Sequence, residues 1–190
     1  MTENLVTALT DEEEPADGSL MLMIDPAWEP TEEVPEPPVK VLLGAWLVTA
    51  DGGRGRFQAN PVYEPATVDS PLDPVDAVLR LIARDKSGDQ QLGSLLSTVL
   101  RDVMLCIALD DQGVALVRPA PDGVPSVLVT TAPGHRRRLK VPAWVDVTVE
   151  QLAAALPARG VDVLLNPGAP ASMRVLADVI RDAAQGTTTS

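Results

Sequence analysis

The spacing of hydrophobic positions changes several times along the chain, and the clearest helical spacing lies just after residue 72. There the apolar residues recur every three or four positions: Val75, Val78, Leu79 and Ile82. Asp73 stands where an N-cap belongs, and Pro74 occupies the first helical position, where a missing N–H removes no hydrogen bond. Asp76 adds a negative charge near the positive end of the helix. The pattern predicts a helix that begins at Pro74.

Three further segments show helical spacing. Leucines repeat at three and four positions over 89–101, and a last amphipathic segment covers 176–184. The third segment begins at Thr148, which has capping-box spacing to Gln151 and precedes a buried stripe of leucine and alanine.

Between these helices the apolar residues alternate or run continuously over short stretches, which is typical of strands. "VKVLLGAWLVTADGGRGRFQAN" (39–60) predicts a hairpin that turns at Asp51-Gly52-Gly53. "VMLCIALDDQGVALVRP" and "SVLVTT" (126–131) predict three neighbouring strands in an antiparallel meander, and "VDVLL" and "ASMRV" predict two more. Helices and strands without regular alternation indicate an α+β fold, a mainly antiparallel sheet with three to four helices packed on it.

Acidic residues are concentrated at the start of the chain. Residues 1–39 carry eleven of the 27 acidic residues and no lysine or arginine, whereas the rest is nearly neutral. We therefore expect three parts: a largely disordered, Pro-rich acidic arm over 1–38, one domain over 39–184 and a disordered tail over 185–190. Within the arm, a short apolar run that Asp25-Pro26 stops predicts a docking strand at 20–25, since proline ends strand pairing. The arm is either a solubilising tail or an acidic docking segment.

The same charge distribution bears on partners and location. An acidic arm repels the backbone of nucleic acids and the surface of anionic membranes, so neither is an expected partner. No apolar run approaches the roughly 20 residues of a membrane span, and the first residues lack the features of a secretory signal. We expect a cytoplasmic protein, and the sequence leaves its oligomeric state open.

Reactive side chains are scarce. The chain has one cysteine, Cys106, and one histidine, His135, so it predicts no disulfide, no thiolate zinc site and no well-supported nucleophile–base pair. Asp110 and Asp111 lie at a predicted hairpin tip, where adjacent carboxylates point apart. Gly52-Gly53-Arg54-Gly55 lacks the order of a phosphate-binding loop. We therefore assign no catalytic residue, cofactor or metal ligand, and do not expect an enzyme.

The residues left for recognition are tryptophans and one basic cluster: Trp28, Trp46, Trp144, Arg136, Arg137 and Arg138. Guanidinium groups match carboxylates in a bidentate geometry, so the arginines suit an acidic partner or the chain's own arm; a solvated loop is the simpler interpretation. Tryptophan is enriched at interface hot spots, although Trp46, with apolar neighbours on both sides, is expected in the core.

Asn166-Pro167-Gly168 follows the last buried run. Proline fixes its own φ, glycine accepts the positive φ of a type II turn, and asparagine can bond the backbone two residues on. We interpret this motif as a turn that needs no ligand.

The ordered set of these motifs resembles a known family. "VLVTTAPGHR", a helix, and then "VDVLLNPGAPASMRV" are similar to the SseB-like domain. With "MIDPAW", "LLGAW" and "NPVYEPATVDSPLDPVDAVLRL" the chain, over roughly 21–176, more closely resembles the actinobacterial proteins associated with type VII secretion.

This resemblance implies an SseB-like fold and a cytoplasmic, non-catalytic accessory or adaptor protein, which would bind secretion components or substrates. It supplies no catalytic residues, and the long acidic arm departs from it. The alternative hypothesis is a regulatory domain that senses a small molecule in a pocket between sheet and helices.

Overall fold

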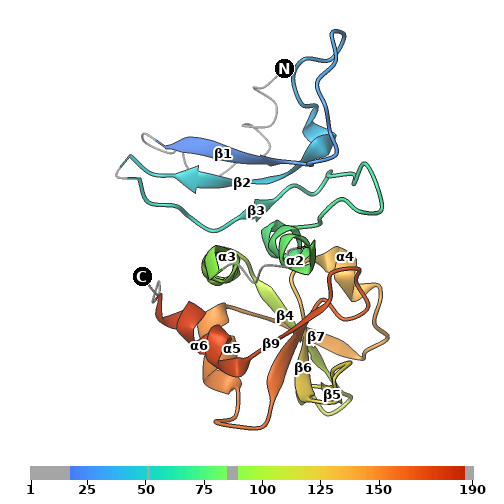
Figure 1. Ribbon diagram of the computed structural model, residues 1–190, viewed down its shortest axis with the longest axis vertical. Helices are drawn as coiled ribbons and strands as arrows, with labels where there is room; N and C mark the ends of the chain where they lie inside the picture. Colours follow the sequence, from blue (N-terminus) through green and yellow to red (C-terminus); the bar gives the residue numbers. More distant parts are fainter. Residues whose placement is uncertain (1–17, 51, 85–89, 187–190) are drawn as a thin grey trace. The chain divides into compact units, whose positions relative to one another are not determined.

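The computed structural model describes residues 18–50, 52–84 and 90–186 of the chain (Figure 1). The chain divides into two compact units, Met1–Ser70 and Pro71–Ser190, and each has its own β-sheet. Most of the predicted acidic arm (1–17), Asp51 of the predicted hairpin turn and the end of the tail (187–190) lie outside the described residues.

The first unit is built on a three-stranded antiparallel sheet of order β1-β2-β3. Its strands are β1 (Ser19–Ile24), β2 (Leu42–Val48), which follows the short 3-10 helix η1 (Val39–Val41), and β3 (Gln58–Ala59). The strand predicted at 20–25 and the hairpin predicted within 39–60 are thus confirmed. Gly44 lets β3 approach β2 closely, because a Cβ there would lie 2.1 Å from the Gln58 carbonyl oxygen.

A buried carboxylate ties together the loops of this first unit. Asp25, 1% exposed, accepts hydrogen bonds from the amides of Ala27 and Ala66 and from the hydroxyls of Tyr63 and Ser70. Burial acts to raise its pKa, but these four bonds stabilise the charged form and hold the pKa below its ordinary value. Asp25, which directly follows β1, therefore also anchors the loop that leads out of β3.

The second unit is built on a six-stranded sheet of order β7-β4-β6-β8-β9, with β5 paired to β6. The strands are β4 (Leu105–Leu109), β5 (Val117–Pro119), β6 (Pro125–Thr130), β7 (Ala143–Val147), β8 (Asp162–Leu165) and β9 (Met173–Val175). Every pair is antiparallel except β6 and β8, which run parallel.

Five helices belong to the described part of this unit: α2 (Pro74–Arg84), α3 (Gln90–Asp102), α4 (Pro133–Arg136), α5 (Val149–Ala155) and α6 (Ala177–Gln185). Helix α6 packs against α5 and α3, and α3 packs against α2 (Figure 1). One face of the sheet is almost completely buried: Leu105, Ile107, Val129, Val163 and Leu165. The predicted helix starts at Pro74 and at the Thr148 capping box are confirmed.

The α+β class is confirmed, with three differences from the sequence prediction. The meander is wrong, because β4 pairs directly with β6 and is joined to the segment before β5 only by one bridge. Strand β7 and the short helix α4 were not predicted. The sheet is also partly parallel, since the chain between β6 and β8 passes through β7 and α5 and returns to run in the same direction as β6.

Candidate functional site

Two parallel strands end side by side in the second unit, and polar side chains gather there. Thr131 directly follows β6 and Asn166 directly follows β8. The Thr131 amide donates to Asn166 Oδ1 at 2.9 Å, and Asn166 Nδ2 donates to the Thr131 hydroxyl oxygen at 2.9 Å. That hydroxyl in turn donates to Asp73 Oδ2 at 2.6 Å. The three residues thus join the start of α2 to the ends of both strands.

Asp73 has a second task at the start of α2. Its Oδ1 accepts from the Asp76 amide at 2.9 Å, which satisfies one of the unpaired N–H groups of the first helical turn. Asp76 Oδ2 accepts from the Leu72 amide and from Arg80 Nε. The two carboxylates are therefore fixed by the local sequence around the helix start.

The only histidine of the chain completes this buried polar cluster. His135, in α4 and 1% exposed, places Nε2 3.8 Å from Asp73 Oδ2 and 3.7 Å from Asp76 Oδ2. Neither ring nitrogen has a hydrogen-bond partner among the described residues, and the same holds for Asp76 Oδ1. The contacts of His135 with the carboxylates are electrostatic, beyond hydrogen-bond length.

Burial governs the protonation of this cluster. Loss of water around Asp73, with a smaller contribution from the nearby Asp76 charge, raises the pKa of Asp73 to about 6. Burial also lowers the pKa of His135; the charges of Arg138 and Arg80 act in the same direction, whereas Asp76 opposes them. Both shifts favour neutral side chains in the interior.

The buried polar cluster lacks the exposure that a substrate would need. Asp73, Thr131, His135 and Asn166 are each at most 6% exposed. The arrangement can hold a proton between Asp73 and its neighbours, and its hydrogen bonds fix three chain segments together. We therefore interpret it as a structural network.

Cys106 and Arg136 meet on the other face of the same sheet, at strands β4 and β7. The Cys106 thiol donates to Asp146 Oδ1 at 2.8 Å, and Arg136 Nη2 contacts both Cys106 Sγ and, at 2.8 Å, Asp146 Oδ1. The Arg136 guanidinium also lies 5.7 Å from the ring centroid of Trp144. Burial and the hydrogen bond to Asp146 raise the pKa of Cys106 to about 11, so this thiol is held in its unreactive protonated form.

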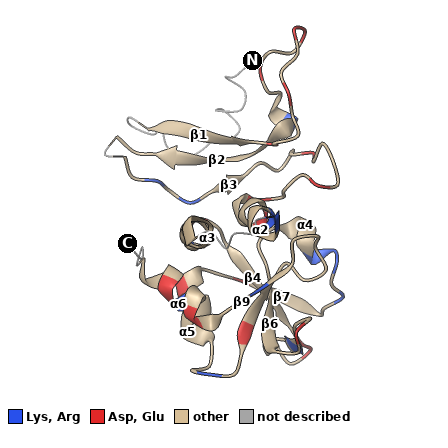
Figure 2. Ribbon diagram, viewed as in Figure 1, with Lys and Arg blue, Asp and Glu red and all other residues tan. Residues whose placement is uncertain are grey.

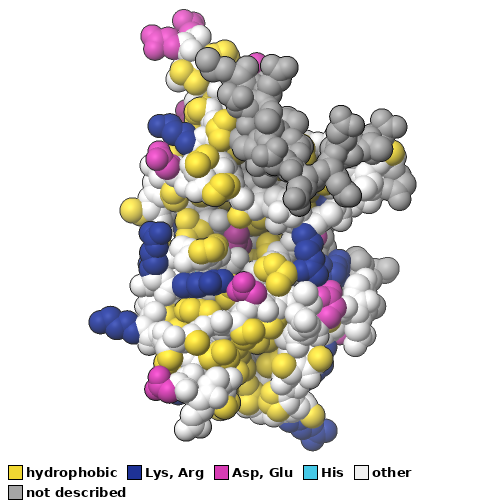
Figure 3. Space-filling model, turned by 180° about the vertical axis from the view of Figure 1, so that it is seen from behind, with side chains coloured by type: hydrophobic (Ala, Val, Ile, Leu, Met, Phe, Trp, Pro, Cys, Tyr) yellow, Lys and Arg dark blue, Asp and Glu magenta, His cyan; other side chains and the backbone are white. Residues whose placement is uncertain are grey.

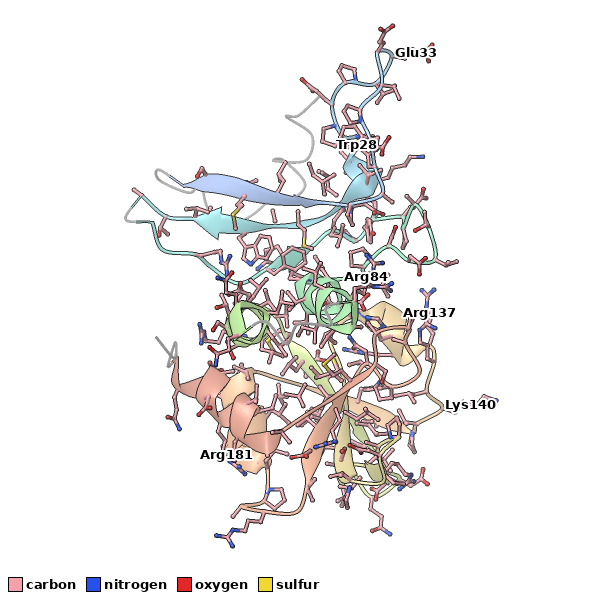
Figure 4. The ribbon with its side chains drawn as sticks, viewed as in Figure 1. Trp28, Glu33, Arg84, Arg137, Lys140 and Arg181 are labelled. Atoms are coloured by element: carbon pink, nitrogen blue, oxygen red, sulfur yellow. The ribbon has the colours of Figure 1, made fainter. Side chains whose placement is uncertain are left out.

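The structure thus brings together two of the predicted contact residues, Arg136 and Trp144, both partly buried. Arg138, exposed, lies beside the turn after β8, where its guanidinium contacts the Gly168 carbonyl oxygen at 3.4 Å. Arg137 is also exposed, and Figure 4 shows it pointing outward with Lys140 from the segment between α4 and β7. The predicted basic loop is therefore partly the short helix α4.

The other two tryptophans belong to the first unit. Trp46 is 6% exposed, with its ring centroid 4.7 Å from that of Phe57 and the Arg54 guanidinium 5.1 Å away, so the core position predicted for it is confirmed. Trp28 is half-buried in the loop after β1 (Figure 4). Among the predicted partner-binding residues, Trp46 is accordingly the one least suited to a surface contact.

The turn at Asn166-Pro167-Gly168 has the predicted form. The Ala169 amide donates to the Asn166 carbonyl, and Gly168 has a φ of 75°. The role expected for the asparagine side chain was wrong, since it bonds Thr131 across the sheet. Asn166 itself adopts a φ of 49°, a conformation that asparagine tolerates better than most residues.

An exposed apolar strand is the feature that sequence reasoning did not weigh as a site. In β1, Leu20, Met21, Leu22 and Ile24 are 38–42% exposed, and they occupy both faces of the strand. Strand β1 is an edge of its sheet, and no described strand pairs with its outer side. The signal in the sequence was an uncharged apolar run of five residues, Leu20 to Ile24, within an acidic segment.

The buried polar cluster was equally hidden from sequence reasoning. Asp73 and Asn166 were interpreted correctly as a cap and a turn, but their meeting at Thr131 depends on β6 and β8 being neighbours. Parallel pairing between distant strands leaves no local sequence pattern.

Comparisons of the chain with models of protein families, with curated proteins and with solved structures find no match. Over the described ranges, each helix is too short or too polar to cross a bilayer. The same residues form no group of three or more His, Cys, Asp or Glu side chains arranged to hold a metal ion.

Proposed function

We propose that this chain is a cytoplasmic, non-catalytic adaptor that binds proteins, associated with type VII secretion. The exposed apolar edge strand β1 carries the protein-binding part of the proposal. Isolated exposed leucines are ordinary, but four large apolar side chains on one edge strand, with no described strand on its outer side, are typical of interaction sites. The link to secretion rests on the family resemblance of the motifs alone.

Two side-chain environments support a role without catalysis. Burial and the hydrogen bond to Asp146 raise the pKa of the Cys106 thiol, and His135 is buried beside two other carboxylates, Asp73 and Asp76. The only cysteine and the only histidine of the chain thus lie beside different carboxylates.

The test is affinity purification of the full chain from an actinobacterium that carries type VII secretion genes, followed by reconstitution with each purified candidate. We expect a secretion component or a secreted substrate to bind directly. If every secretion component and substrate fails to bind the purified chain, the proposal is wrong.

The small-molecule alternative keeps one supporting observation. His135 Nδ1, His135 Nε2 and Asp76 Oδ1 are buried without hydrogen-bond partners, and a small polar ligand could satisfy them. A thermal-shift screen against metabolites discriminates, because a ligand that binds the folded state raises the melting temperature. A reproducible rise that His135→Ala abolishes would favour the sensor.

A further inference from the structure

We propose that β1 captures an extended, uncharged apolar segment of a partner protein, flanked on both sides by lysine or arginine, as an added strand. This inference rests on the proposed protein-binding function and names the chemistry of its partner. Strand addition supplies affinity through main-chain hydrogen bonds and specificity through side chains on alternate faces.

The free hydrogen-bonding groups of β1 can be assigned from its neighbours. The carbonyls of Leu43 and Leu47 accept from Asn60 and Gly55 on the β3 side of β2. Backbone direction alternates along a strand, so Gly44 and Trp46 face β1 instead.

The register then assigns each residue of β1. Met23 is opposite Gly44 and Met21 is opposite Trp46, so the backbone N–H and C=O groups of these two methionines point toward β2. Leu20 and Leu22 therefore direct their N–H and C=O groups outward, where a partner strand can bond them.

Strand β1 also lacks most devices that protect an edge from pairing. Natural edges carry lysine, proline or inward charges, whereas Ser19–Ile24 has none of these within it. A register irregularity falls only at its end, between Met23 and Ile24, before Asp25 and Pro26. About four residues of this edge are thus regular, and within the ranges that the structure describes no strand pairs with their outer side.

Charge decides between a foreign partner and a second copy. Acidic residues flank β1 in the sequence on both sides; those of the loop after Asp25 are Glu29, Glu32, Glu33 and Glu36. Figure 2 shows red acidic positions along that loop. Glu33 points outward at the tip of that loop (Figure 4). Pairing β1 with β1 of a second copy would oppose two arms that hold eleven acidic residues each and no basic ones. A strand with basic flanks instead gains attraction at both ends.

The experiment uses the full chain and three short peptides of one apolar, β-branched core. One has two lysines at each end, one has two glutamates at each end, and one has the lysines and a central proline. We expect the lysine-flanked peptide to bind at least about tenfold more tightly than the other two at low salt. Amide exchange measured by NMR should slow on binding at Leu20 and Leu22 and change little at Met21 and Met23.

Matched variants of the chain separate main-chain pairing from apolar contact. Leu22→Pro removes an outward N–H and leaves the hydrogen bonds to β2 in place. It should therefore lower the affinity of the chain for the lysine-flanked peptide by at least about tenfold. Leu22→Thr keeps the backbone amide and should lower the affinity for the same peptide only about two- to threefold. The exchange data on the unmodified chain keep the test valid if the proline variant fails to fold.

Three results would overturn the inference: no binding of the lysine-flanked peptide, equal binding of the glutamate-flanked peptide, or binding without slowed exchange at Leu20 and Leu22. A dimer in sedimentation that Leu22→Pro dissolves would also overturn it, by making a second copy the occupant. If a secretion component binds Leu22→Pro as tightly as the unmodified chain, the adaptor proposal stands and only this inference fails.

Discussion

Asn166 combines two demands that few residues meet. Its backbone has a φ of 49°, and its fully buried amide bonds the Thr131 amide and hydroxyl. Substituting it removes the hydrogen bonds, the backbone tolerance or both, depending on the residue chosen.

We therefore predict different costs for two substitutions at Asn166. Asn166→Gly keeps the positive φ but leaves the buried Thr131 amide without its hydrogen-bond acceptor. This loss should lower the unfolding free energy by about 1–3 kcal/mol. Asn166→Ala adds the strain of a left-handed backbone and should cost roughly 1 kcal/mol more. Urea denaturation of both variants measures the difference; equal, negligible losses would contradict the assignment.

Asp73 makes a prediction about pH. Its pKa is about 6 in the folded state, above the ordinary value of 3.8, so between these values the folded chain binds a proton that the unfolded chain has released. Its contribution to stability is complete below pH 3.8 and is lost as the pH rises through 6. The pKa shift corresponds to about 3 kcal/mol.

Asp73→Asn removes this titration. The unfolding free energy of the variant, relative to the unmodified chain, should rise by up to about 3 kcal/mol between pH 4 and pH 7. His135, whose lowered pKa has the opposite effect, is present in both proteins and largely cancels. Denaturant titrations between pH 4 and pH 7 measure this difference in unfolding free energy. The control is Asp111→Asn, because Asp111 is exposed in a turn. A difference that does not change with pH would refute the role of Asp73.

At the scale of elements, local sequence decided where helices begin. At α5 the Thr148 side chain accepts from the Gln151 amide, and the Gln151 side chain accepts from the Thr148 amide. The two bonds satisfy the backbone amides of Thr148 and Gln151, which have no partner within the helix. Because the two residues are three positions apart, the capping box could be predicted directly from the sequence.

The capping box also gives a stability prediction. Thr148→Ala should lower the unfolding free energy by about 1 kcal/mol, whereas Thr148→Ser keeps the accepting oxygen and should change it by less than about 0.5 kcal/mol. Thermal unfolding of the two variants checks the pair. An equal loss in both would assign the effect to the threonine methyl group instead of the cap.

Pairing between elements was predicted less well than the elements themselves. Strands β4, β5 and β6 were expected to form a meander because they follow one another, yet β6 pairs with β4 on one side and with β8 on the other. Strand β7, absent from the prediction, covers the outer side of β4. Its sequence, AWVDV, is short and follows a proline, so its strand character depends on the partner that it finds.

At the scale of the whole molecule, charge is the dominant property. The net charge is −12, and almost all of the imbalance lies in residues 1–39. Such an arm attracts basic segments over distances comparable with the Debye length, which salt shortens.

We predict that salt acts mainly on association with the lysine-flanked peptide. Raising the salt from about 0.02 M to 0.5 M should lower the association rate roughly tenfold and leave the dissociation rate nearly unchanged. Stopped-flow binding measures both rates. A variant in which the four glutamates of the loop after β1 become glutamine should show a shallower salt dependence, and identical slopes would contradict steering by that loop.

The face of the molecule in Figure 3 shows hydrophobic side chains of the second unit bordered by charged ones. Large apolar residues exposed in this unit include Val114, Val117 and Val145. They are spread over separate strands and turns, so they do not offer the continuous edge that β1 offers.

The sequence by itself determined the α+β class, the helix starts at Pro74 and Thr148, the strand at β1, the turn at Pro167-Gly168 and the asymmetry of charge. Each depends on residues within a few positions of one another, where sterics and capping act locally. Tertiary structure alone decided that β6 and β8 run parallel, that Asp73, Thr131, His135 and Asn166 meet in the interior, and that none of the described strands pairs with the outer edge of β1. These depend on which distant segments pair, and that choice is made by burial of the whole sheet.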